Sequence, residues 1–171
     1  MNILLLVLGL AATTATAKSY DVVEGDVSWV ATGTPGFLHI NGTGGRLTGH
    51  ADQAAGGKVT GLFTVAVVDF TTGMGLRDKH MREKYLEVGT YPKALLTIDA
   101  WTPTVADSSF TGTLTLKGQA KPVSGQASYA DGKLRAAFTV MLNNYPLVGV
   151  PSWAGITVAH DVQVTVEATV K

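Results

Sequence analysis

The densest group of chemically reactive side chains lies in the segment TTGMGLRDKHMREKYLEVGTYP, residues 71–92. Six of the eight positions from Arg77 to Lys84 are charged, whereas charged residues make up 15% of the whole chain. Asp78 and His80 could act with a serine from elsewhere in the chain as a hydrolytic triad. The candidate serines are Ser124 and Ser152. No G-x-S-x-G segment occurs in the chain, and we therefore expect no enzyme.

The histidines and the cysteine count decide whether a metal site is expected. The four histidines show neither H-x-H nor H-E-x-x-H spacing, although folding could still bring three of them together. Cysteine is absent, which removes thiolate ligands, disulfides and a cysteine nucleophile. We therefore expect no metal and no other cofactor. The histidines concerned are His39, His50, His80 and His160.

The charged segment itself predicts one short helix, over residues 76–86. Asp78 with Arg82, and Lys79 with Glu83, are acid–base pairs four residues apart, a spacing that supports a helix. Glycine and proline follow the segment as stop signals. A solvated face on a helix that connects two strands would account for the charges without any chemistry.

Most of the remaining chain alternates apolar and polar residues with a period of two, as half-buried antiparallel strands do. The C-terminal segment DVQVTVEATVK is the clearest case, and Asp131-Gly132 predicts a type I′ hairpin turn. So many short strands predict either a closed barrel or a two-sheet sandwich, because every apolar face needs a partner. The predicted strands are residues 20–23, 27–31, 37–41, 46–50, 58–69, 93–99, 110–117, 122–129, 134–142 and 161–171.

The first 17 residues, MNILLLVLGLAATTATA, are typical of a secretory signal peptide with cleavage after Ala17. Their apolar run is shorter than the roughly 20 residues needed to span a bilayer, so we expect no stable membrane insertion after cleavage. Residues 18–171 then form one domain in the periplasm or outside the cell. Thirteen basic and thirteen acidic residues give zero net charge, which argues against a nucleic-acid partner.

Two motifs resemble the YceI family of lipid-binding, polyisoprenoid-binding proteins. The charged segment matches the family's Thr-Gly, Arg-Asp-x-His-Met, aromatic-Leu and Tyr-Pro spacing, and GTLTLKGQAKPV, residues 112–123, is similar to its Leu-Thr-Leu-His-Gly-x-x-Lys-Pro-Val. The resemblance runs from about Tyr20 to Lys171. In two places the chain departs from the family pattern: Glu24-Gly25 stands where the family has His-Ser, and Lys117 replaces a histidine.

The resemblance implies an all-β, lipocalin-like antiparallel β-barrel of about eight strands, with the short helix inserted mid-chain. It also implies an exported, non-catalytic protein that holds an isoprenoid, a quinone-like lipid or another amphiphilic chain lipid in the barrel. Arg77, Lys79 and His80 would then face a phosphate or quinone head group. The expected wall residues, which ordinary core packing would explain equally well, are Leu96, Ile98, Leu114, Leu116, Leu134, Phe138, Val164 and Val166.

A second hypothesis is a barrel without a small ligand, acting in envelope stress or as a protein-interaction module. Its contact surface would be the loop at residues 143–155 together with Trp29, Trp101 and Trp153. The same loop could instead be a lid over the barrel mouth or an inert connection. Under either hypothesis an edge strand could pair two copies into a homodimer.

Overall fold

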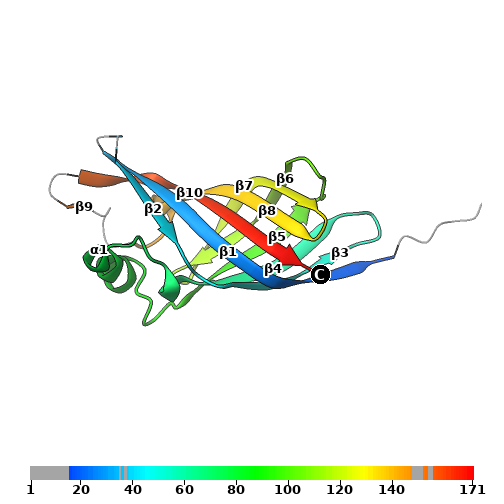
Figure 1. Cartoon of the computed structure of the whole chain (residues 1–171), viewed down its shortest axis with the longest axis horizontal. Coiled ribbons are helices and arrows are strands. Elements are labelled where there is room, and N and C mark those ends of the chain that lie inside the picture. Colours follow the sequence, from blue (N-terminus) through cyan, green and yellow to red (C-terminus); the bar gives the residue numbers. More distant parts are fainter. Residues whose placement is uncertain (1–15, 35, 37, 148–151, 154–155) are drawn as a thin grey trace, which may run out of the picture.

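The alternating strands form one closed antiparallel sheet whose apolar faces meet inside a ring (Figure 1). The computed structural model describes residues 16–34, 36, 38–147, 152, 153 and 156–171. The strands are β1 (Lys18–Thr34), β2 (His39–Thr43), β3 (Leu47–Gln53), β4 (Val59–Ala66), β5 (Lys93–Trp101), β6 (Ser108–Leu116), β7 (Gln119–Ala130), β8 (Lys133–Met141), β9 (Ser152–Trp153) and β10 (Ile156–Val170). The helical turns are η1 (Val67–Asp69), α1 (Gly75–His80), η2 (Met81–Tyr85) and η3 (Leu142–Asn144).

Eight of these strands close the ring, in the order β1-β3-β4-β5-β6-β7-β8-β10, and β10 pairs back onto β1. The structure is therefore the expected lipocalin-like barrel with one short helix, and the sandwich is excluded. Among the described strands, β2 and β9 stand at the two ends of the sheet order. The expected edge-strand homodimer, which stays a prediction, would have to use one of these two.

The first long strand was predicted as two separate strands, and this prediction was wrong. β1 is continuous, with a bulge between Val22 and Glu24 in its pairing with β10. A bulge inserts one residue and reverses which side of the strand faces inward. Tyr20 therefore lines the interior on one side of the bulge, and Val27 and Trp29 line it on the other.

Two hairpin turns have the type I′ geometry, which requires positive φ at both central residues. In the predicted turn Asp131 and Gly132 have φ of 50° and 76°, and in the β6–β7 turn Lys117 and Gly118 have φ of 49° and 71°. The first turn confirms the prediction, and Ala130 and Lys133 are the first residues to pair on either side of it.

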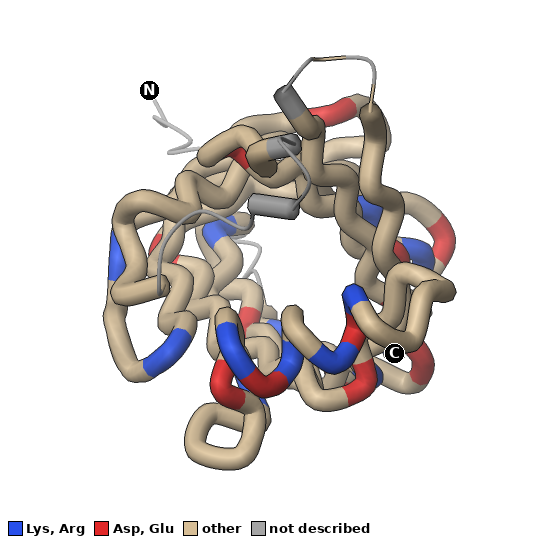
Figure 2. Tube along the Cα trace, turned by 90° about the vertical axis from the view of Figure 1, so that its left-hand side faces the viewer, with Lys and Arg blue, Asp and Glu red and all other residues tan. Residues whose placement is uncertain are grey.

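The barrel has two distinct ends (Figure 1). We call the end that carries α1, η2, η3 and the β6–β7 turn the helix end, and the end that carries Lys18, the C-terminus and the β7–β8 turn the far end. The predicted helix is confirmed as α1 continued by the π-helical turn η2. The strand before it is shorter than predicted: β4 ends at Ala66, and residues 67–69, which were expected to continue the strand, form the 3₁₀ turn η1. Figure 2 looks into the helix end and shows the charged helix on the lower rim of the strand ring.

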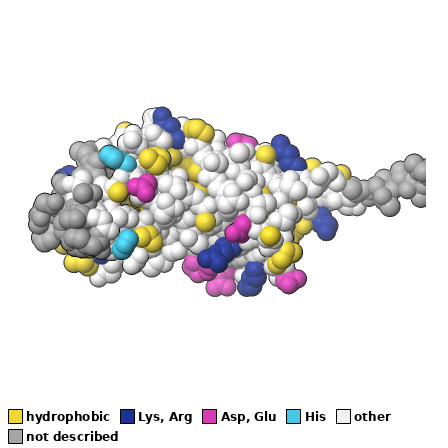
Figure 3. Space-filling model, turned by 90° about the horizontal axis from the view of Figure 1, so that it is seen from above, with side chains coloured by type: hydrophobic (Ala, Val, Ile, Leu, Met, Phe, Trp, Pro, Cys, Tyr) yellow, Lys and Arg dark blue, Asp and Glu magenta, His cyan; other side chains and the backbone are white. Residues whose placement is uncertain are grey.

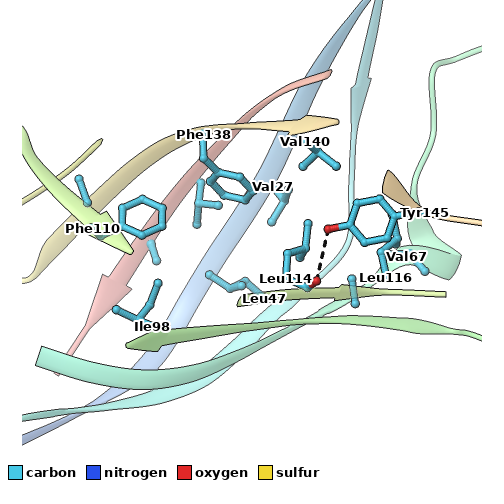
Figure 4. Close-up of a cluster of buried hydrophobic side chains, with 14 residues drawn as sticks. Val27, Leu47, Val67, Ile98, Phe110, Leu114, Leu116, Phe138, Val140 and Tyr145 are labelled. Atoms are coloured by element: carbon cyan, nitrogen blue, oxygen red, sulfur yellow. Dashed lines mark hydrogen bonds between the residues drawn. The ribbon is translucent and has the colours of Figure 1, made fainter. Parts of the chain in front are cut away.

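Inward-facing aromatic and aliphatic side chains pack together in the barrel (Figure 4). Phe110 and Phe138 meet edge to face, with ring centroids 6.1 Å apart. Near the helix end the hydroxyl of Tyr145 donates a hydrogen bond to the Leu114 carbonyl (3.3 Å), and burial raises the pKa of Tyr145 to about 12. On the outer face seen in Figure 3, charges of both signs are scattered between polar and apolar side chains. No helix in the described part of the chain is long and apolar enough to cross a membrane.

Candidate functional site

A cavity of about 830 Å³ runs through the barrel from one end to the other. Leu142 and Tyr85 line it at the helix end, and Tyr20 and Tyr129 line it at the far end. Its volume is in the range of small-molecule sites, which is roughly 300–1,000 Å³. All the wall residues expected from the alternation line this cavity, namely Leu96, Ile98, Leu114, Leu116, Leu134, Phe138, Val164 and Val166. The interior is thus an open tunnel rather than a completely filled core.

Polarity along the tunnel is uneven. Its middle is lined by side chains such as Phe63, Ile98 and Phe110, which offer no hydrogen-bonding group. Charged and hydroxyl-bearing lining residues in the described part of the chain are at the two ends. A guest that fits must therefore be apolar over most of its length and can carry polar groups only at its ends.

Positive charge gathers at the helix end of the tunnel. Arg77 and His80, both expected as site residues, line the cavity there, and so does Lys84. Lys84 was missed by the sequence reasoning, and its Nζ lies 5.5 Å from the centre of the Tyr85 ring, a cation–π contact. Lys79, the third residue expected to face a head group, is exposed and does not line the cavity. This pattern would favour an anionic or electron-rich group at the helix end.

Asp78 fixes the helix to the loop that precedes it. Its carboxylate is 5% exposed and accepts hydrogen bonds from Thr71 Oγ1 (2.5 Å), Thr72 N–H (2.7 Å) and Thr72 Oγ1 (2.5 Å). Desolvation raises the pKa of this carboxyl, but the bonds from Thr71 and Thr72, with the nearby charge of Arg82, outweigh it and hold the pKa below its usual value. The expected solvated pairing of Asp78 with Arg82 was therefore wrong, because the carboxylate points inward to the loop.

The same loop positions Arg77. Arg77 Nε donates to Thr72 Oγ1 (2.7 Å) and its Nη2 donates to the Thr72 carbonyl (3.1 Å). Thr72 thus links the guanidinium to the Asp78 carboxylate. The loop is tied to the barrel as well, since Thr43 and Thr71 exchange two backbone hydrogen bonds of 2.9 Å. Arg77 is consequently held in place at the tunnel mouth before any ligand binds.

The profile of the YceI-like domain matches residues 18–170, nearly the whole described chain. The chain belongs to the YceI family. Solved structures agree with this fold. BcnA of Burkholderia cenocepacia superposes with a TM-score of 0.69 at 18% identity, over 86% of this chain and 96% of that one. A polyisoprenoid-binding domain of Saccharophagus degradans implicated in plant cell wall breakdown gives 0.66 at 14% identity, over 89% and 97%. A comparison with curated proteins found no match.

Lys117, which replaces the histidine of the YceI motif, does not line the tunnel. Its side chain is 3% exposed, and its Nζ donates to Glu87 Oε1 (2.5 Å) and to the Pro146 carbonyl (2.9 Å). It joins the β6–β7 turn to the segment after the helix and to the loop after η3. In this member of the YceI family the residue at this position therefore makes a structural contact at the helix end and does not face the tunnel.

The described members of the hydrolytic triad considered for this YceI-family chain, Asp78, His80 and Ser124, are not assembled as one. Asp78 is occupied by Thr71 and Thr72, His80 is exposed at the helix end, and Ser124 is exposed on β7. The side chain of Ser152 lies outside the described residues. Within the described ranges, no three His, Asp or Glu side chains are grouped so that they could hold a metal ion.

A different serine–histidine–aspartate group lies on the outer surface of β1 and β3. Ser19 Oγ is 3.0 Å from His50 Nε2, and His50 Nδ1 is 2.9 Å from Asp21 Oδ1. However, Asp52 lies 3.1 Å from Nε2 and accepts the Ser19 hydroxyl (2.9 Å). The hydrogen bond to Asp21, opposed by desolvation and reinforced by Asp52, raises the pKa of His50, and the Ser19 hydroxyl donates to the Asp52 carboxylate rather than to a free imidazole. This surface cluster therefore serves as a polar link between β1 and β3.

Two of the tryptophans proposed for a protein-contact surface point into the barrel instead of toward solvent. Trp29 and Trp101 both line the tunnel. The ring of Trp29 lies against Gly42, where a Cβ atom would come within 2.0 Å of it, and Trp101 Nε1 donates to Ser108 Oγ (2.9 Å). The expected contact surface is wrong for these two residues. Six residues of the loop proposed as a lid, 148–151, 154 and 155, lie outside the described residues.

Proposed function

We propose that this protein is an exported, non-catalytic carrier that holds one amphiphilic isoprenoid or similar chain lipid inside its barrel. The observation that carries the proposal is the tunnel of about 830 Å³, which is apolar along its middle and cationic at the helix end. A chain lipid with a polar head has the same distribution of polarity. The Saccharophagus degradans domain of the same fold, named as polyisoprenoid-binding, supports this ligand class.

Burial of the tail supplies the affinity in this proposal. Each methylene group moved from water into an apolar interior is worth about 0.8 kcal/mol. An isoprenoid tail has no polar atom along its length, so the wall of Leu96, Ile98 and Leu114 leaves nothing unsatisfied. The tunnel is largely preformed, which lowers the entropy cost of binding.

The head group would sit at the helix end. Arg77 is held there by Thr72, and His80 and Lys84 line the same mouth. The N–H groups of these side chains can donate hydrogen bonds to the oxygens of a phosphate or a quinone. No bond needs to break for a carrier to work, and the hydrolytic arrangements considered above lack an activated nucleophile. Residues 1–17, of which 1–15 lie outside the described residues, would direct export to the periplasm or the medium before cleavage.

Blocking the tunnel tests this function. The Ile98→Trp, Leu116→Trp double variant places bulk inside the tunnel, in its middle and near the helix end, and Leu95→Trp, Leu62→Trp places the same bulk on the outer wall, where Leu62 is 49% exposed. We expect a polyprenyl phosphate to raise the melting temperature of the wild type and of the outer-wall variant, but not that of the blocked variant. Equal stabilisation of all three proteins would show that the lipid does not enter the tunnel.

A further inference from the structure

A pair of tyrosines spans the interior at the far end of the tunnel. Tyr20 on β1 and Tyr129 on β7 meet edge to face, with ring centroids 5.9 Å apart and planes at 67°. In the ring order β10 and β8 lie between β1 and β7, so these two strands are not neighbours. A contact between their inward-facing side chains must therefore cross the lumen rather than run along the wall.

Hydrogen bonds hold both tyrosines in this crossing position. The hydroxyl of Tyr20 donates to Gln53 Oε1 (3.3 Å), and Gln53 Nε2 donates to the Gly57 carbonyl (3.3 Å). The backbone N–H of Tyr129 donates to the Thr104 carbonyl (2.9 Å), which ties this part of β7 to the β5–β6 loop. The Tyr20 side chain and the Tyr129 backbone are thus each tied to a loop at the far end of the barrel.

We propose that the Tyr20–Tyr129 pair closes the far end of the tunnel and sets the longest tail that the protein holds fully buried. This inference rests on the proposed function and deepens it by naming the tail length. A chain that enters with its head at the helix end meets the two rings with its last carbons. Any tail longer than the tunnel must leave its surplus in water.

The length of β1 gives the size of that tail. The lining residues of β1 extend from Tyr20 to Ala31, eleven residue steps. At about 3.3 Å per residue and a strand tilt of roughly 40°, this corresponds to a tunnel about 28 Å long. Three backbone bonds span roughly 3.3–3.6 Å, so the four main-chain bonds of an isoprene unit span about 4.4–4.8 Å. The tunnel therefore holds about six extended isoprene units.

A length series of prenols tests this assignment. We would measure the affinities of farnesol, geranylgeraniol, hexaprenol, octaprenol and decaprenol by competition with a fluorescent prenyl probe. In the wild type we expect affinity to rise up to hexaprenol and then to stay level. In Tyr129→Ala the end is open, and octaprenol should bind about tenfold more tightly than hexaprenol, because further methylene groups are buried between the strand ends.

Two further variants separate closure from simple structural support. Tyr129→Phe keeps the ring contact and should keep the wild-type limit, and Tyr20→Ala should remove the limit even if Tyr129→Ala fails to fold. A wild-type affinity that still rises from hexaprenol to decaprenol would overturn this inference while leaving the carrier function in place. The inference would also be overturned, with the carrier function left in place, if the affinities of both alanine variants stopped rising at hexaprenol. If no prenol of any length binds, the proposed function fails, and the tail limit fails with it.

Discussion

At the scale of single residues, Asp78 shows why a charge can be buried at low cost. A buried carboxylate is stable only when hydrogen bonds replace its water, and Asp78 accepts three such bonds from Thr71 and Thr72. The same bonds favour its ionised form, which is why its pKa is lowered although desolvation acts in the other direction.

Replacing Asp78 should therefore cost stability only where the carboxylate is ionised. We expect Asp78→Asn to lower the free energy of unfolding by about 1–3 kcal/mol at neutral pH, because an amide NH₂ would face donors of Thr71 and Thr72. A lowered pKa means that the native contribution is present above the unfolded pKa and is lost as the pH falls through the lowered value. The difference should hence shrink below about pH 4. Urea unfolding at neutral pH and below pH 4 measures the loss of unfolding free energy, with a substitution of the exposed Glu83, Glu83→Gln, as the control. A loss in Asp78→Asn that is as large in acid as at neutral pH would contradict this explanation.

His50 should behave in the opposite way. Its pKa is raised, mainly by the hydrogen bond to Asp21, so the bonding of its cation stabilises the native state below about pH 6.5. That contribution is lost as the pH rises through the raised pKa. In an NMR titration we expect Asp21→Asn to lower the His50 pKa more than Asp52→Asn does. Equal pKa values in the wild type and in Asp21→Asn would refute the assignment.

At the scale of elements, long-range contacts hold the helix end together. The Thr43–Thr71 bridge, the Asp78 bonds and the pair of Lys117 with Glu87 join α1 and η2 to β2 and to the β6–β7 turn. Local helix pairs contribute little by comparison, because exposed pairs four residues apart are worth only about 0.3–0.5 kcal/mol.

The Lys117 contact can be tested by a double-mutant cycle. Lys117 is buried and Glu87 is 40% exposed, so removing the lysine leaves a carboxylate that water can still reach. We expect Glu87→Gln to cost about 1–3 kcal/mol, because it leaves the buried ammonium without its counter-charge, and Lys117→Met to cost less. The double variant should be more stable than the sum of the two losses predicts. Strict additivity would show that the two side chains do not interact.

The elements also show how far the sequence could be read. The alternation of Leu114, Leu116, Val164 and Val166 was enough to place these side chains inside the barrel, because a strand's period of two allows only two faces. It could not show whether the interior was open, since a tunnel wall and a filled core have the same pattern. The bulge after Val22 was not predicted. It interrupts the alternation of inward-facing residues, and one continuous strand was therefore predicted as two.

The site was less predictable than the barrel, because its contacts join residues distant in sequence. Arg77 and His80 could be named from the helix motif, but choosing Lys84 over Lys79 required the direction in which the helix faces the mouth. The contact of Lys117 with Glu87 joins residues about thirty positions apart, and that of Tyr20 with Tyr129 joins residues more than a hundred positions apart. Neither pair leaves a local pattern.

At the scale of the whole molecule, the polarity of the tunnel predicts which part of a lipid each end contacts. Lys84→Gln should weaken binding of a polyprenyl phosphate by roughly fivefold to tenfold and leave binding of the matching polyprenol nearly unchanged, because only the phosphate needs the charge. Lys79→Gln, on the same helix but away from the cavity, is the control. Equal losses for the phosphate and the alcohol would move the head group away from the helix end.

The central claim is that the barrel carries a chain lipid, and the lipid that it holds in its own host tests this most directly. The protein would be purified without added lipid and extracted with organic solvent, and the extract analysed by mass spectrometry beside the Ile98→Trp, Leu116→Trp variant. We predict one prenyl-chain lipid per protein in the wild type and none in the blocked variant. An extract without any chain lipid, together with no thermal shift on adding polyprenyl compounds, would contradict the account.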